Sequence, residues 1–194
     1  MSALDVKAPV DSTITIDLRN RPLAGLLAWL WPGAGHFYQR RYAKGALFMV
    51  CILGTFFFGL AVGEGKVVYV GQHLEGSKRA TIYTTLQRWP FLLQSGVGLP
   101  VTPAVVNFYA TKPSNGGAPI LGGWMSPPKD EQQLAEWQER LAARFDIGLL
   151  YTMVAGLLNI LAIYDAAAGP ALSELEANDK KPKPGEKPPA DKNP

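Results

Sequence analysis

The sequence is poor in the residues and motifs on which most enzyme and metal sites depend. Its single cysteine, Cys51, lies in an apolar stretch, which excludes an intramolecular disulfide and a cysteine-based metal site. His36 has no other His, Cys or carboxylate in its own apolar window, so we interpret it as an interfacial aromatic with a polar tip. The chain also has no GxSxG nucleophile motif and no phosphate-binding glycine loop. We therefore expect a protein that is not an enzyme and that binds no cofactor or metal.

Two further absences concern targeting and partners. Residues 1–21 mix acidic and basic side chains without an apolar run, so we expect a polar N-terminal segment and not a cleaved signal peptide. The 19 Lys and Arg residues are interleaved with 16 Asp and Glu residues, giving a net charge of +3. No basic stripe suited to nucleic acid results from this pattern.

Charge itself is absent from long parts of the chain. There are 19 uncharged residues between Lys44 and Glu64, and 18 between Asp146 and Asp165. About 20 apolar residues are enough for a helix to cross the ~30 Å hydrocarbon core of a bilayer. These two windows therefore predict membrane-spanning helices, the first within a membrane hairpin over 22–63 and the second over 147–169.

Two other uncharged windows are interrupted by proline and glycine. In 22–39, Pro32 predicts a break near Trp31, and the segment either spans or forms a re-entrant or interfacial piece. The segment 89–111 contains three prolines and two glycines, which favours a broken helix, a re-entrant loop or a surface-packed segment over a regular span. The predicted fold is thus a mainly α, helical membrane protein with three to four membrane segments.

The remaining segments are predicted to lie outside the bilayer. Residues 64–88 alternate β-branched and polar side chains, which predicts a small insert with a short β-hairpin. A turn-rich linker follows over 112–129, and Ser126 before a proline is typical of a helix start. Residues 130–146 have the pattern of an amphipathic helix that could continue into the last span. The proline-rich segment 170–194 is predicted to be a disordered tail.

One stripe of small and weakly polar residues recurs along the last apolar window. Its members are Gly148, Thr152, Gly156 and Asn159. Small residues let helix backbones approach closely, and Thr or Asn can donate hydrogen bonds across the contact. The stripe predicts helix packing, either within the chain against the second apolar helix or between copies in a homo-oligomer.

The most distinctive segment is PGAGHFYQRRYAKGALF, residues 32–48. It resembles the signature of the two-transmembrane-helix hairpin domain, in which a glycine-rich, His/Arg-Phe-Tyr motif precedes a basic turn and a second helix. The matching and flanking positions are Pro32, Gly33, Gly35, His36, Phe37, Tyr38, Arg40, Arg41 and Gly45. In that family the second helix tends to close with an aspartate, whereas here the aspartate, Asp165, closes the last window.

The chain is therefore similar to such a hairpin with a long insertion, as in an uncharacterised group of bacterial, largely planctomycete, integral membrane proteins. The resemblance implies a multi-pass protein of the bacterial inner membrane and transfers no catalytic residue. At a helix end, we expect Asp165 to cap the helix or to pair with a basic residue such as Arg40 or Arg41. Positive-inside counting with four spans favours a cytoplasmic N-terminus but places the arginine-rich turn on the opposite side.

These observations favour a structural or interaction protein whose partners are the lipid bilayer and, through small-residue helix faces, other membrane proteins or a second copy. A small transporter or channel is the alternative, because broken membrane helices often line substrate sites and the segment 89–111 carries Gln94, Thr102 and Asn107.

Overall fold

The computed structural model describes residues 20–71, 88–111 and 118–168. Every regular element within these ranges is helical, which confirms a mainly α fold. The predicted β-hairpin is not confirmed, because residues 64–71 form a turn followed by an irregular segment and the rest of the insert lies outside the described residues. Most of the polar N-terminal segment, part of the linker and the predicted tail lie outside them as well.

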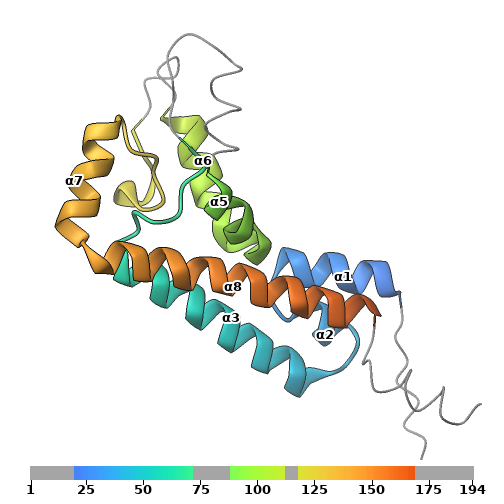
Figure 1. Cartoon of the computed structure of the whole chain (residues 1–194). Coiled ribbons are helices and arrows are strands. Elements are labelled where there is room, and N and C mark those ends of the chain that lie inside the picture. The colour runs from blue at the N-terminus through green and yellow to red at the C-terminus, as the bar shows by residue number, and fades with distance from the viewer. Residues whose placement is uncertain (1–19, 72–87, 112–117, 169–194) are drawn as a thin grey trace, which may run out of the picture.

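Two described helices are long and apolar enough to cross a membrane, α3 (Tyr42–Val62) and α8 (Ala143–Ala168). At 1.5 Å per residue they are about 31 and 39 Å long. They pack side by side in antiparallel directions (Figure 1). Gly59 and Gly148 make the close approach near one end, where a Cβ on Gly148 would lie 2.6 Å from the Gly59 carbonyl oxygen. The described residues contain two helices of sufficient length and apolar composition, so three to four membrane segments are not confirmed.

The first apolar window does not form one spanning helix. It is divided into α1 (Arg21–Leu30) and the short α2 (Ala34–Tyr38). Pro32 has no amide hydrogen to continue a helix, and Gly33 takes a left-handed conformation with φ 84°. The chain therefore reverses at the predicted break, and α2 returns along α1, with Gly35 directly against the Ala24 carbonyl. A 10-residue α1 is only about 15 Å long, too short to cross a bilayer.

The third apolar window is also broken. It contains α5 (Trp89–Gln94), two 3-10 turns, η1 (Ser95–Val97) and η2 (Leu99–Val101), and α6 (Thr102–Ala110). The reversal lies at Gly98, whose φ of 83° is accessible to glycine. This turn meets the end of α1, because Gly98 packs against the carbonyl groups of Trp29 and Leu30. The two broken segments thus meet tip to tip beside α8.

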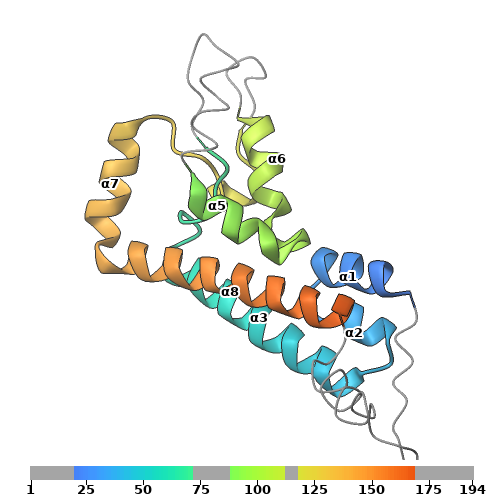
Figure 2. The same cartoon turned by 45° about the vertical axis from the view of Figure 1, so that its right-hand side comes forward.

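Figures 1 and 2 show how these layers are arranged. In both views α1, α5 and α6 lie on one side of α8, and α3 lies on the other. The main core is formed where α3, α5 and α8 converge, and it includes Ile52, Phe56, Val97 and Ala155. A smaller cluster joins α1 to the end of α8 through Ala24, Ala28 and Ala166.

The amphipathic helix α7 (Glu131–Leu141) begins later than predicted and does not continue into α8. Its capping residue is Asp130 and not Ser126, since the Asp130 carboxylate accepts a 2.7 Å hydrogen bond from the Gln133 amide. Ala142 takes a φ of 45°, which ends α7 and turns the chain. Figure 1 accordingly shows α7 standing away from the axis of α8.

Large apolar side chains cover the outside of the helix pair. Fewer than a third of the residues in the apolar window of α3 are buried, and a third in that of α8. The exposed groups on these two helices include Leu47, Val50, Phe57, Phe58, Leu150, Leu157, Ile160, Leu161 and Tyr164. A water-soluble helix would bury such a surface or replace it with polar residues. The exposed apolar surface is compatible with helices that lie in a membrane.

Candidate functional site

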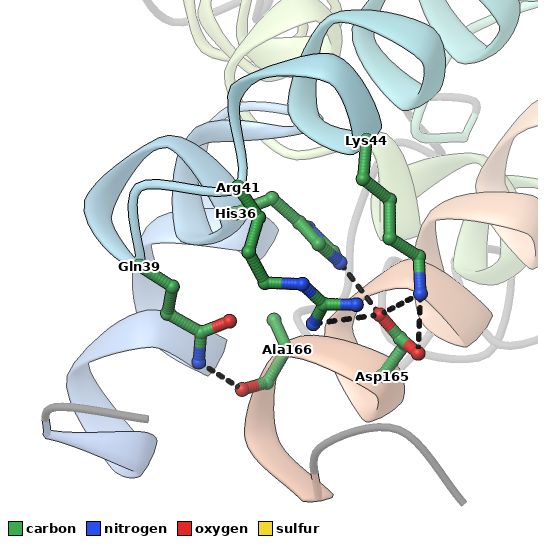
Figure 3. A network of polar contacts seen from close by, with 6 residues as sticks. All are labelled: His36, Gln39, Arg41, Lys44, Asp165 and Ala166. Atoms are coloured by element: carbon green, nitrogen blue, oxygen red, sulfur yellow. Dashed lines mark hydrogen bonds and ion pairs between the residues drawn. The ribbon is translucent and has the colours of Figure 1, made fainter. Parts of the chain in front are cut away.

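The end of the molecule where α3 begins and α8 ends contains a polar cluster around Asp165 (Figure 3). The Asp165 Oδ2 atom lies 2.7 Å from His36 Nε2 and 2.7 Å from Lys44 Nζ. Its Oδ1 atom accepts a second bond from Lys44 Nζ at 2.8 Å. Arg41 Nη1 makes a longer contact of 3.5 Å with Oδ2. One carboxylate is therefore shared by two permanent cations and an imidazole.

The short helix α2 is fixed to this end of the molecule by His36 in its middle and by Gln39 at its C-terminal cap. His36 is completely buried and its ring packs 4.9 Å from the ring of Phe48. At the end of α2, Gln39 donates a 2.7 Å hydrogen bond to the Ala166 carbonyl. That carbonyl is in the last turn of α8, where backbone oxygens have no partner within the helix. The Asp165 cluster thus joins α2, the start of α3 and the end of α8 into one unit.

The remaining residues of the hairpin signature allow these elements to pack closely. Gly33 touches the Gly45 carbonyl, and a Cβ on Gly45 would meet the ring of Phe37 at 3.1 Å. Pro32 is fully buried at the reversal, and Tyr38 packs against the alanine cluster of α1 and α8. These positions carry no reactive group in this arrangement. Their role is to bring backbones together.

Arg40 differs from its neighbours in the basic turn. It has a positive φ of 61° and an exposed side chain, and that side chain makes no hydrogen bond or ion pair with the described residues. Of the two arginines considered as partners of Asp165, only Arg41 is in contact with it. Lys44 and Gln39, which the sequence analysis did not single out, contribute closer contacts. Their only sequence signal is their position within one helical turn of the signature.

The α8 stripe is covered within the chain by four different elements, α1, α3, α5 and η1. Gly148 contacts α3, and Gly156 lies against the Leu93 carbonyl of α5. Thr152 Oγ1 accepts a 2.9 Å hydrogen bond from Gln94 Nε2. Asn159 Nδ2 donates to the Gly96 carbonyl at 2.8 Å and to the Ala28 carbonyl at 3.1 Å. Asn159 therefore joins the tips of both broken segments to α8, and the stripe is not free to contact a second copy.

Gln94 and Asn107 serve as internal linkers of the third window. Gln94 is fully buried and also donates to the Val67 carbonyl at 3.2 Å. Asn107 donates to the Trp124 carbonyl and accepts from the Ile120 amide, both at 2.7 Å. Buried amides in an apolar environment are costly unless they are bonded, and these bonds explain how both are accommodated. Thr102, in contrast, only bonds the Leu99 carbonyl one turn earlier.

The opposite end of the helix pair has a looser group of charges. Glu64 forms ion pairs with Arg140 at 2.9 Å and Arg144 at 3.4 Å, which connect the α3 end to α7 and the start of α8. Nearby, the Arg88 guanidinium lies 3.4 Å from the centroid of the Tyr69 ring. Burial raises the pKa of the Tyr69 hydroxyl above its ordinary value, and the positive charge of Arg88 opposes that shift.

The described residues contain no group of three or more His, Cys, Asp or Glu that could hold a metal ion. The Asp165 cluster has one carboxylate and one imidazole surrounded by cations, a composition that repels a metal ion. The cluster can neutralise the charge of the Asp165 carboxylate and hold that carboxylate in place at the end of the apolar helix α8.

Comparison with protein families gives one match. A family described as a family of unknown function, DUF6677, matches residues 23–180. The chain belongs to this family. The matched DUF6677 region contains the Asp165 cluster, the α8 stripe and both broken segments. No curated protein and no solved structure matches the chain.

Proposed function

We propose that this chain is a multi-pass integral membrane protein of the bacterial inner membrane with a structural or interaction role. The observation that supports the proposal is the exposed apolar surface of α3 and α8, next to polar groups that are bonded inside the molecule. In this role the helix pair anchors the segments at its Glu64 end, namely α7 and the neighbouring loops, at one face of the bilayer.

The Asp165 cluster supports a relation to the two-transmembrane-helix hairpin domain. The signature and the closing aspartate are more than 120 residues apart in sequence, yet His36 and Asp165 are in direct contact. In a simple hairpin the same pairing would be made by two consecutive helices. The segment between α3 and α8 is then an insertion that leaves the pairing of the helix ends intact.

For the topology we propose two full crossings and two re-entrant segments that enter from opposite faces. Gly25 near the start of α1 lies against Ala167 at the end of α8, and the basic turn contacts Asp165. The start of α1, the basic turn and the end of α8 therefore belong to one side. In the four-span arrangement the arginine-rich turn and the N-terminus lie on opposite sides of the membrane. In the arrangement proposed here they lie on the same side, and the positive-inside rule assigns both to the cytoplasm.

Single-cysteine labelling in a Cys51→Ala background tests this topology. We expect Asn20→Cys and Ala43→Cys to be protected from an impermeant maleimide in intact cells, and Gln132→Cys to be labelled. If 22–39 crossed the membrane once, Asn20→Cys and Ala43→Cys would be labelled from opposite sides. Recovery of the protein in the soluble fraction after alkaline extraction would contradict the membrane assignment itself.

A transporter or channel is the second candidate, and one observation favours it. The tips of the two broken segments meet beside α8, near the buried side chains of Gln94 and Asn159, whose Oε1 and Oδ1 atoms have no hydrogen-bond partner in the described residues. However, glycine-to-backbone contacts close this junction, with a Cβ on Gly96 only 2.8 Å from the Gly156 carbonyl. Solute flux into liposomes that is abolished by Asn159→Leu would support transport over anchoring.

A further inference from the structure

The end of the molecule that contains the Asp165 cluster has more positive charge than its single carboxylate can neutralise. Four cations lie there among the described residues, namely Arg21, Arg40, Arg41 and Lys44, against one anion, Asp165. Lys44 is paired with this carboxylate, since its Nζ contacts both oxygens. Arg21 and Arg40 make no ion pair with the described residues. The excess is concentrated in the turn between α2 and α3.

The two arginines of this turn have unused hydrogen-bond donors. An arginine side chain has five N–H donors, and Arg41 uses them in one contact of 3.5 Å with Asp165. The Arg40 side chain is exposed and uses none of its donors with the described residues. A guanidinium group is suited to a phosphate, because it can donate two parallel hydrogen bonds to it.

The surroundings of the turn are those of a lipid headgroup region. Tyr42 and Tyr164, on either side of the Asp165 cluster, are 63% and 70% exposed, and such rings accumulate at the membrane–water boundary. Directly beyond them, α3 and α8 expose the apolar side chains of Leu47 and Leu161. A phosphate bound at the turn would thus be followed by a surface for hydrocarbon chains.

We propose that Arg40 and Arg41 bind the phosphate of an anionic phospholipid from the cytoplasmic leaflet. This inference rests on the proposed membrane location and adds a ligand to it. The adjoining apolar surface selects a lipid over free phosphate, because a soluble ion gains nothing from that surface. The ion pairs of Asp165 hold the turn in place, so that the lipid site is formed before the lipid binds.

Native mass spectrometry of the full-length protein, released from nanodiscs that contain equal amounts of phosphatidylglycerol and phosphatidylcholine with identical chains, tests the site. We expect retained phosphatidylglycerol to exceed phosphatidylcholine, and Arg40→Gln to reduce this preference about fivefold, the effect of one basic residue near an anionic surface. Arg144→Gln at the opposite end is the matched control and should leave the preference unchanged.

Three results would overturn the proposal. They are equal retention of both lipids by the native protein, the same loss in Arg40→Gln and Arg144→Gln, and displacement of phosphatidylglycerol by inorganic phosphate, which would indicate a site for the free ion. Because the Arg40 side chain is exposed and makes no ion pair with the described residues, its variant is expected to keep the native helix content, which circular dichroism checks. A protein that stays in the membrane fraction without lipid preference contradicts the lipid site alone, whereas a soluble protein contradicts both proposals.

Discussion

Both ends of the α3–α8 pair are closed by ion pairs between distant parts of the chain, but the two ends differ in their access to water. At the Asp165 end the carboxylate is 24% exposed, and its partners His36 and Arg41 are 0% and 16% exposed. At the opposite end Glu64 is 37% exposed, and both of its arginine partners exceed 50%. Because water screens charge, an ion pair of a given length contributes less to stability at the exposed Glu64 end than at the less exposed Asp165 end.

The difference also has a structural cause. The Asp165 end is covered by the α1–α2 hairpin, which brings a buried histidine and a backbone hydrogen bond to the end of α8. The Glu64 end is covered by α7, in which four of the 11 residues are charged, and by Trp124, which packs against Gly65. We therefore expect the Asp165 cluster to hold the helix ends together and the Glu64 group to adjust the position of α7.

The largest expected effect is that of Asp165→Ala. It leaves Lys44, Arg41 and His36 without their shared acceptor, and we expect a loss of about 3 kcal/mol in the free energy of unfolding. The measurement is reversible unfolding in mild detergent. Asp146→Ala, in the first turn of the same helix, is the control and should cost less than ~1 kcal/mol. Equal losses in the two variants would contradict the expectation that the Asp165 end contributes more to stability than the opposite end.

A second variant tests whether the covering hairpin creates the buried environment. In Gly35→Val the new side chain would collide with the Ala24 carbonyl and the Ala28 side chain, so we expect a loss of about 2 kcal/mol. Gly54→Val is the matched control on α3, where a Cβ meets nothing within 4 Å. Equal unfolding temperatures of the two variants in detergent would contradict the idea that close α1–α2 packing shields the Asp165 cluster from water.

Lys44→Met should have a smaller effect. The substitution removes one cation and two short contacts with Asp165. His36 and Arg41 still contact the carboxylate. Because Lys44 is about one-third exposed, we expect a loss of about 1 kcal/mol. Thermal unfolding at low and high salt is the measurement, and the double variant with Asp165→Ala should lose less than the sum of the single variants. Additive losses would contradict a direct pairing.

Glu64→Gln should have the smallest effect, at most ~0.5 kcal/mol, since its pairs with Arg140 and Arg144 are exposed. We expect the change to appear mainly in α7. Limited proteolysis near residues 130–142 should be faster in this variant, while the unfolding temperature of the whole protein stays nearly constant. A loss comparable to that of Asp165→Ala would show that exposure does not decide the strength of these pairs.

Some parts of this arrangement follow directly from local sequence. The charge-free windows predicted both long helices, because a bilayer requires an uninterrupted apolar length. Pro32 and Gly33 predicted the break of the first window, since one removes an amide donor and the other permits a left-handed turn. The breaks of the third window followed from its prolines and glycines in the same way.

Other parts left no local signal. Nothing in the sequence marks Ala142 as the point where α7 ends, because the amphipathic pattern continues through it and no glycine or proline is present. Asp130 and not Ser126 caps α7, since the Asp130 carboxylate accepts a hydrogen bond from the Gln133 amide and the Gln133 Oε1 atom accepts one from the Lys129 amide. Which cation reaches Asp165 also depends on the rotation of α3 about its axis, so Lys44 was missed and Arg40 was considered.

The sequence by itself determined the apolar lengths, the positions of the chain breaks and the residues small enough for close helix contact, because each depends on neighbouring residues. Only the tertiary structure decided that the first broken segment folds back on itself and places the basic turn against Asp165. It likewise assigned the α8 stripe to partners within the chain. The contacts of the basic turn with Asp165 join residues more than 120 positions apart, and the bonds of Thr152 and Asn159 to the other helices join residues 58 to 131 positions apart, which no local pattern encodes.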